Sequence, residues 1–133
     1  MALKWKVSHP ERLVVAVSQY EVTAADVLFC ADELLKAGLN DYRKLFDLTR
    51  LARAMSPVDI RSVGMRLAAA AHGRGFGPIA IVVVSDAIAG SVALFQGAVA
   101  ADRPVQIFRD LYVARVWLDV TAPVDQVPEA ARE

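Results

Sequence analysis

The polar side chains that could form a site for an anion lie at the end of a short apolar run and after it, and they are Asp47, Thr49, Arg50, Arg53 and Ser56. The run predicts a strand at about residues 43–48. Ser56-Pro57 predicts the start of the next helix, because serine caps free amides and proline suits the first helical position. Asp59, three residues after Ser56, can complete a pair like that of a capping box. Since a helix N-terminus attracts anions, this group could hold a small anionic ligand or a phosphorylated serine.

Further polar side chains follow the later predicted strands, namely Ser85, Asp86 and Asp110. In an open parallel sheet, ligands bind beyond the carboxyl ends of the strands, so these residues and those around Ser56 would form one ligand-binding rim. The alternative is that the serines and aspartates serve only as helix caps, while both arginines are solvated. The sequence leaves both interpretations open.

No set of residues in the sequence matches the pattern of a catalytic site or of a metal site. His9 lies in a predicted turn and His72 ends a predicted helix, and neither has partners at the spacing of a catalytic base or metal ligand. The single Cys30 falls one residue outside the apolar stripe of its predicted helix, and we interpret it as a packed small hydrophobe. The glycine-rich residues 73–77 follow a helix and precede a strand, the reverse of the order in a phosphate-binding loop. We therefore predict no enzymatic activity, no metal and no cofactor.

The composition is that of one globular domain. Apolar residues make up 56% of the 133 residues and charged residues 23%, with fifteen basic and fifteen acidic side chains. A net charge of zero gives no electrostatic basis for binding nucleic acid or an anionic membrane surface. The first ten residues lack the apolar core of a signal peptide, so we expect a cytosolic protein.

The apolar pattern predicts an α/β fold with elements in the order ββαβαβαβα. The first two strands can form an antiparallel hairpin, and the later strand–helix units predict a mostly parallel five-stranded sheet with four helices. Strands are expected at residues 3–7, 12–17, 43–48, 79–84 and 105–108, and helices at 23–36, 57–72, 86–101 and 110–118. Gly64 inside the second helix predicts a close backbone approach. We expect residues 1–120 to form one domain and residues 121–133 to be a flexible tail.

Residues 79–101 are long and apolar enough to span a bilayer, but Ser85-Asp86 divides them into a strand and an alanine-rich helix, so we predict no membrane span. One stripe of this helix would face the sheet: Ile88, Val92, Phe95 and Val99. The far side is apolar too: Ala93, Leu94, Ala98 and Ala101. The alternatives are alanines tolerated at a surface, a second subunit, or a lipid-like ligand. With zero net charge, we predict a homodimer whose interface uses Leu94, Ala98 and Ala101.

The element order, Leu-Phe-Asp-Leu-Thr-Arg at residues 45–50, and Ile-Phe-Arg-Asp-Leu-Tyr-Val-Ala-Arg-Val-Trp-Leu at residues 107–118 together resemble the SpoIIAA-like family of STAS/CRAL-TRIO-type domains. The similarity covers about residues 12–118. It implies the fold of anti-sigma-factor antagonists, in which a partner kinase phosphorylates a serine in an Asp-Ser-Ser-Gly loop. Ser56 is the nearest counterpart of that serine, although Met55-Ser56-Pro57-Val58 lacks the paired serines and the glycine.

We therefore predict a cytosolic, non-enzymatic interaction or regulatory module, similar to an anti-sigma antagonist, that self-associates and binds a protein partner through the rim around Ser56. The alternative function is that of a carrier that buries a small apolar, lipid-like molecule near the helix at residues 86–101. The resemblance to CRAL-TRIO-type domains implies this second class of ligand.

Overall fold

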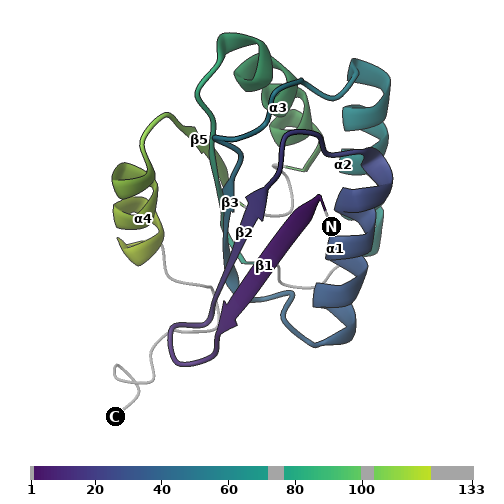
Figure 1. The fold of residues 1–133 in the computed structure, drawn as a ribbon. Coiled ribbons are helices and arrows are strands. Elements are labelled where there is room, and N and C mark those ends of the chain that lie inside the picture. Colours follow the sequence, from purple (N-terminus) through teal and green to yellow (C-terminus); the bar gives the residue numbers. More distant parts are fainter. Residues whose placement is uncertain (1, 72–76, 100–103, 121–133) are drawn as a thin grey trace.

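One mixed β-sheet organises the chain (Figure 1). The computed structural model describes residues 2–71, 77–99 and 104–120. Its elements are β1 (Leu3–Ser8), β2 (Leu13–Ser18), α1 (Ala24–Lys36), β3 (Arg43–Asp47), α2 (Pro57–Ala71), β4 (Ile79–Val82), α3 (Asp86–Val99), β5 (Val105–Phe108) and α4 (Leu111–Val120). The five strands lie side by side in their sequence order. The predicted α/β fold, with five strands and four helices, is confirmed.

The hairpin and the parallel crossovers form where the sequence predicts them. β1 pairs antiparallel with β2, and every later pair of neighbouring strands is parallel. The bounds of the described elements differ from the predicted ones by at most two residues. The apolar stretch that begins at Ile79 is divided into β4 and α3, as predicted. Among the described residues, no helix combines the length and the apolar character needed to cross a membrane. The predicted tail, residues 121–133, lies outside the described residues, as does His72.

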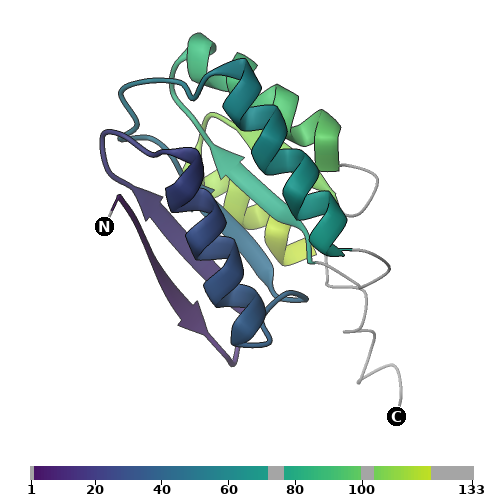
Figure 2. The same ribbon diagram turned by 90° about the vertical axis from the view of Figure 1, so that its right-hand side faces the viewer.

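Helices cover the two faces of the sheet unequally. α1, α2 and α3 lie on one face and α4 lies on the other (Figure 1, Figure 2). α4 contacts β3, β4 and β5. Because β4 lies between β3 and β5 and is covered on both faces, all four of its residues are buried, which accounts for its continuous apolar run. β1 is at an edge of the sheet, where its Lys4 and Lys6 are exposed and oppose pairing with another chain.

Apolar cores lie on both faces of the sheet. On one face, residues of β3 and β4 pack against Ala114 and Leu118 of α4. On the other face, α1 packs against β1 and β2 through Cys30 and Leu34. The stripe of α3 predicted to face inward is buried in the core, and its residues are Ile88, Val92, Phe95 and Val99.

α2 and α3 approach each other closely at Gly64, as the sequence predicts. A Cβ atom added at Gly64 would lie 2.6 Å from the Cβ of Ala98, well inside van der Waals contact. Ala98 has no flexible side chain that could move aside. The two helices can therefore keep this separation only while position 64 carries no side chain.

We expect Gly64→Ala to lower the free energy of unfolding by about 1–3 kcal/mol, because the added methyl group forces the two helices apart. Gly97→Ala is the matched control, since a Cβ there meets nothing within 4 Å and should stabilise α3 by about 0.5–1 kcal/mol. Urea unfolding measures both effects. Gly64→Ala combined with Ala98→Gly should recover most of the loss. A Gly64→Ala variant as stable as Gly97→Ala would show that the helices are not in close contact here.

Candidate functional site

Three polar residues of the predicted rim cap helices, namely Ser56, Ser85 and Asp110. The Ser56 hydroxyl accepts the backbone N–H of Asp59 at 3.2 Å. The Ser85 hydroxyl accepts the N–H of Ile88 at 3.1 Å, and the Asp110 carboxylate accepts the N–H of Val113 at 3.0 Å. Each side chain therefore satisfies one of the amides that a helix leaves free at its start. The capping interpretation is confirmed for these three residues.

The other rim residues bond mainly to their neighbours in the loops. Asp47 Oδ1 accepts the Thr49 N–H at 3.0 Å and the Thr49 hydroxyl at 2.6 Å. Arg53 Nε lies 3.9 Å from Glu21 Oε2. Arg50 is exposed. Among the described residues, no hydrogen bond or ion pair joins Arg50 or Arg53 to Ser56.

Asp86 is also paired, through a 2.8 Å bond that Arg109 donates to its carboxylate. The helix starts of α2, α3 and α4 thus share the carboxyl edge of the sheet, as predicted, but their polar atoms are occupied locally. A role for this rim in phosphorylation or partner binding stays a prediction.

We expect Ser56→Ala to lower the free energy of unfolding by about 1 kcal/mol, because the Asp59 amide loses its acceptor. Ser62→Ala is the matched control, since Ser62 is exposed in the interior of the same helix, where alanine is favoured. Denaturant midpoints measure the difference. Equal midpoints for Ser56→Ala and the wild type would show that Ser56 does not cap the helix. The geometric basis for phosphorylation at this site would then be lost as well.

The residues predicted to form an oligomer interface on α3 lie partly inside the protein. Leu94 is half-buried and packs against the core beside α3. Ala98 lies against Gly64 of α2. The prediction that Ala98 faces away from the protein is wrong, because Ala98 lies against α2. Leu94 is in part exposed, and its role in an interface stays a prediction. Ala101 lies outside the described residues. The oligomeric state itself stays a prediction.

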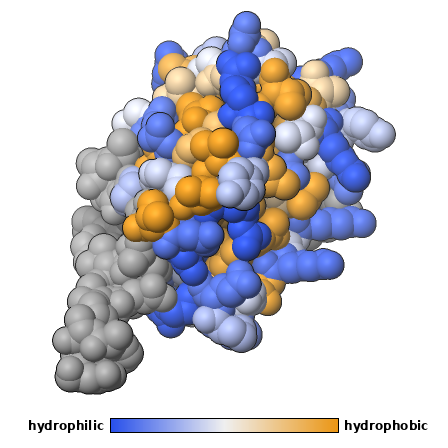
Figure 3. Space-filling view, turned by 90° about the vertical axis from the view of Figure 1, so that its left-hand side faces the viewer, coloured by the Kyte–Doolittle hydropathy of each residue, from blue (hydrophilic) through white to orange (hydrophobic). Residues whose placement is uncertain are grey.

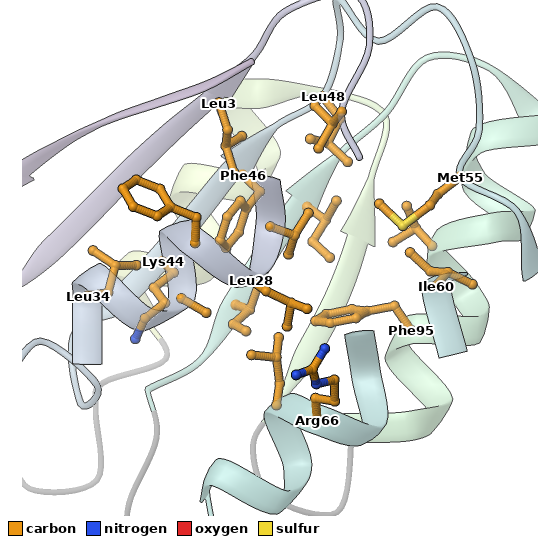
Figure 4. A pocket seen from close by; sticks show the side chains of 18 of the residues that line it. Leu3, Leu28, Leu34, Lys44, Phe46, Leu48, Met55, Ile60, Arg66 and Phe95 are labelled. Carbon is orange, nitrogen blue, oxygen red and sulfur yellow. The ribbon is translucent and has the colours of Figure 1, made fainter. Parts of the chain in front are cut away.

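A cavity of about 650 Å³ lies between α1, α2, α3 and the face of the sheet that they cover. Its lining is mainly aliphatic and aromatic, and it includes Leu28, Ala31 and Leu34 of α1, Phe46 and Ile81 of the sheet, Ile60 and Leu67 of α2, Ile88, Val92 and Phe95 of α3, and Leu48, Leu51 and Met55 of the loop after β3. Leu28, Phe46 and Phe95 point toward the same space from three different elements (Figure 4). The arrangement can enclose an apolar molecule.

Lys44 supplies a buried charge to the cavity wall. It is only 5% exposed, and its ammonium group donates to the backbone oxygens of Leu39, Asn40 and Tyr42 at 3.2, 2.9 and 2.8 Å. Burying an ammonium group is costly unless its N–H groups are bonded, and Lys44 has three such groups. Lys44 therefore fastens the segment after α1 to β3.

Ser91 holds another part of the wall. Its hydroxyl donates to the backbone oxygen of Met55 at 3.1 Å. The bond joins α3 to the loop that connects β3 with α2, and both residues line the cavity. The loop that forms this end of the cavity is therefore held against α3 by a hydrogen bond.

Cys30 lies in the core beside the cavity. Its exposure is 1%, and burial raises the pKa of its thiol to about 12, while the nearby Lys44 ammonium lowers the pKa by a smaller amount. The thiol is protonated at neutral pH and packs as an apolar group, as expected. The prediction that Cys30 falls outside the buried stripe of α1 is wrong, because Cys30 and Leu34 are the buried residues of this helix.

Sequence reasoning missed the structural role of Lys44 and the part that α1 and the loop after β3 take in the cavity wall. The available signal for a buried, bonded charge was the place of Lys44 directly before the apolar residues Leu45 and Phe46 of a strand. Among the described residues, no three His, Cys, Asp or Glu side chains group as metal ligands would.

Comparison of the chain with protein-family models, with curated proteins and with solved structures found no significant match. The resemblance to SpoIIAA-like domains therefore stays a prediction.

Proposed function

We propose that this protein binds a small apolar molecule in the cavity beneath α1, α2 and α3. The observation that carries this proposal is the combination of a volume of about 650 Å³ with walls made mainly of aliphatic and aromatic side chains. Ligand sites commonly have volumes of roughly 300–1,000 Å³ and the same mixture of apolar walls with a few polar groups.

The energetics of packing support the same function. Protein interiors are close-packed and contain few spaces larger than a water molecule. An apolar molecule in this space would supply contacts that its aliphatic and aromatic walls otherwise lack.

The reactive groups near the cavity favour binding over catalysis. The thiol of Cys30 is protonated because burial raises its pKa to about 12. The Lys44 ammonium group donates to three backbone carbonyls, so it is held by the fold. The ligand-carrier class also agrees with what the resemblance to CRAL-TRIO-type domains implies.

Filling the cavity tests this function. The wild-type protein should bind the neutral apolar probe N-phenyl-1-naphthylamine at one saturable site, measured by its fluorescence. Ala31→Phe should weaken this binding by roughly tenfold or more, because Ala31 lines the cavity on α1 and the new ring occupies the space. Ala93→Phe is the matched control, since Ala93 is exposed on α3 and should leave the affinity unchanged.

Circular dichroism and thermal unfolding show whether each variant is folded. If folded wild-type protein does not bind the probe, or if Ala31→Phe and Ala93→Phe bind it equally well, the cavity is not the ligand site.

A second candidate function, self-association, is favoured by the outer surface of α4. Tyr112, Val113, Val116 and Val120 are 75%, 49%, 42% and 77% exposed. Figure 3 shows hydrophobic side chains gathered on this face of the molecule between hydrophilic ones. Exposed apolar groups on a helix rimmed by polar residues are typical of an interaction surface.

A second copy of the chain is the partner that suits this surface. The net charge of zero opposes association little. Arg115 and Asp119 of α4 pair with Glu11 and Arg43 of the same chain at 3.7 and 4.0 Å, so they bring no unpaired charge to this surface. The proposed homodimer interface is therefore the outer face of α4.

Val116→Glu should convert a dimer into a monomer, because it places a charge at the centre of the apolar surface. Sedimentation velocity at tens of micromolar protein measures the change. Ala93→Glu, on the exposed side of α3, is the control and should leave the dimer intact. A wild-type protein that sediments as a monomer at this concentration would contradict self-association and leave the ligand-binding proposal unaffected.

A further inference from the structure

We propose that the molecule bound in the cavity is a single-chain amphiphile with an anionic head group, and that Arg66 holds this head at the edge of the cavity. This inference rests on the proposed function, because it concerns the ligand of the same site. The observation behind it is the distribution of charged and polar side chains around an otherwise apolar wall.

The other polar side chains that line the cavity already have partners. The Lys44 ammonium group donates to three backbone carbonyls. The Asp32 carboxylate lies 3.1 Å from the ammonium group of Lys36. The Ser91 hydroxyl donates to the Met55 carbonyl. These groups are held by bonds within the protein, and a ligand could recruit them only by breaking those bonds.

Arg66 differs from these residues in position and in pairing. It is exposed on α2, and it also lines the cavity. Figure 4 draws Arg66 of α2 and Phe95 of α3 among the side chains that line the cavity. Among the described residues, no carboxylate forms an ion pair with Arg66. A long arginine side chain suits this position, because its stem can lie on apolar groups while its charged end meets water.

The chemistry of the guanidinium group defines the ligand class. Its planar array of N–H groups matches a carboxylate or a phosphate and forms paired, charge-assisted bonds with it. An alkyl chain would then extend from this head into the space between Phe46 and Phe95. Affinity should rise roughly fourfold for each added methylene until the chain fills the cavity.

Three probes with the same chain separate the contribution of the head from that of the tail. Dodecanoate, dodecyl phosphate and dodecanol are titrated against protein loaded with N-phenyl-1-naphthylamine, and displacement of the probe gives each affinity. Wild-type protein should prefer at least one of the two anions over the neutral alcohol by roughly tenfold. A stronger preference for dodecanoate identifies a carboxylate head, and one for dodecyl phosphate identifies a phosphate head. The preference should fall as salt is added, because Arg66 is exposed.

Arg66→Gln should abolish the preference for the anion and leave the affinity for dodecanol unchanged. Arg61→Gln is the matched control, because Arg61 is an exposed arginine of the same helix that does not line the cavity. Equal affinities of the wild type for all three probes, or an anion preference that survives in Arg66→Gln, would overturn the role of Arg66 while leaving apolar binding in place. Failure of all three probes to bind would instead overturn the proposed function.

Discussion

The close contact between α2 and α3 determines the shape of the layer above the sheet. Gly64 lets the backbone of α2 approach Ala98, and a side chain at that position would not fit. α2 therefore contacts α3 more extensively than it contacts α1, and α1 stands apart in Figure 2. The apolar side chains of α1 and α2 therefore line a space above β3 and β4, because the two helices do not pack against each other along their whole length. The cavity is thus a consequence of the way in which one pair of helices packs.

Polar interactions hold the walls of this space in place. Lys44 joins β3 to the segment that follows α1, and Ser91 joins α3 to the loop before α2. The helix caps at Ser56 and Ser85 define where α2 and α3 begin. Between these bonds the wall consists mainly of apolar side chains. A rigid frame around an apolar interior is the arrangement that a preformed ligand site requires.

Local signals in the sequence were sufficient to predict the elements, but the packing between helices was not predictable from them. The run of β-branched residues in β4, the proline at the start of α2 and the polar caps each depend on a few neighbouring residues. In contrast, Ala98 faces α2 because of Gly64, which lies 34 residues earlier in the chain. The burial of Cys30 depends in the same way on β1 and β2. The apolar character of α3 on nearly every face did indicate the region of the cavity, since it favours a ligand beside this helix as one interpretation.

A crystal structure of the protein grown with 12-bromododecanoate would show whether the cavity receives an apolar ligand. The bromine atom marks the end of the chain and is located by its anomalous scattering. We expect one strong bromine peak inside the cavity, between the side chains of Phe46 and Phe95. A bromine peak found only on the outer face of α4, or a cavity without bromine in crystals saturated with the compound, would contradict this expectation.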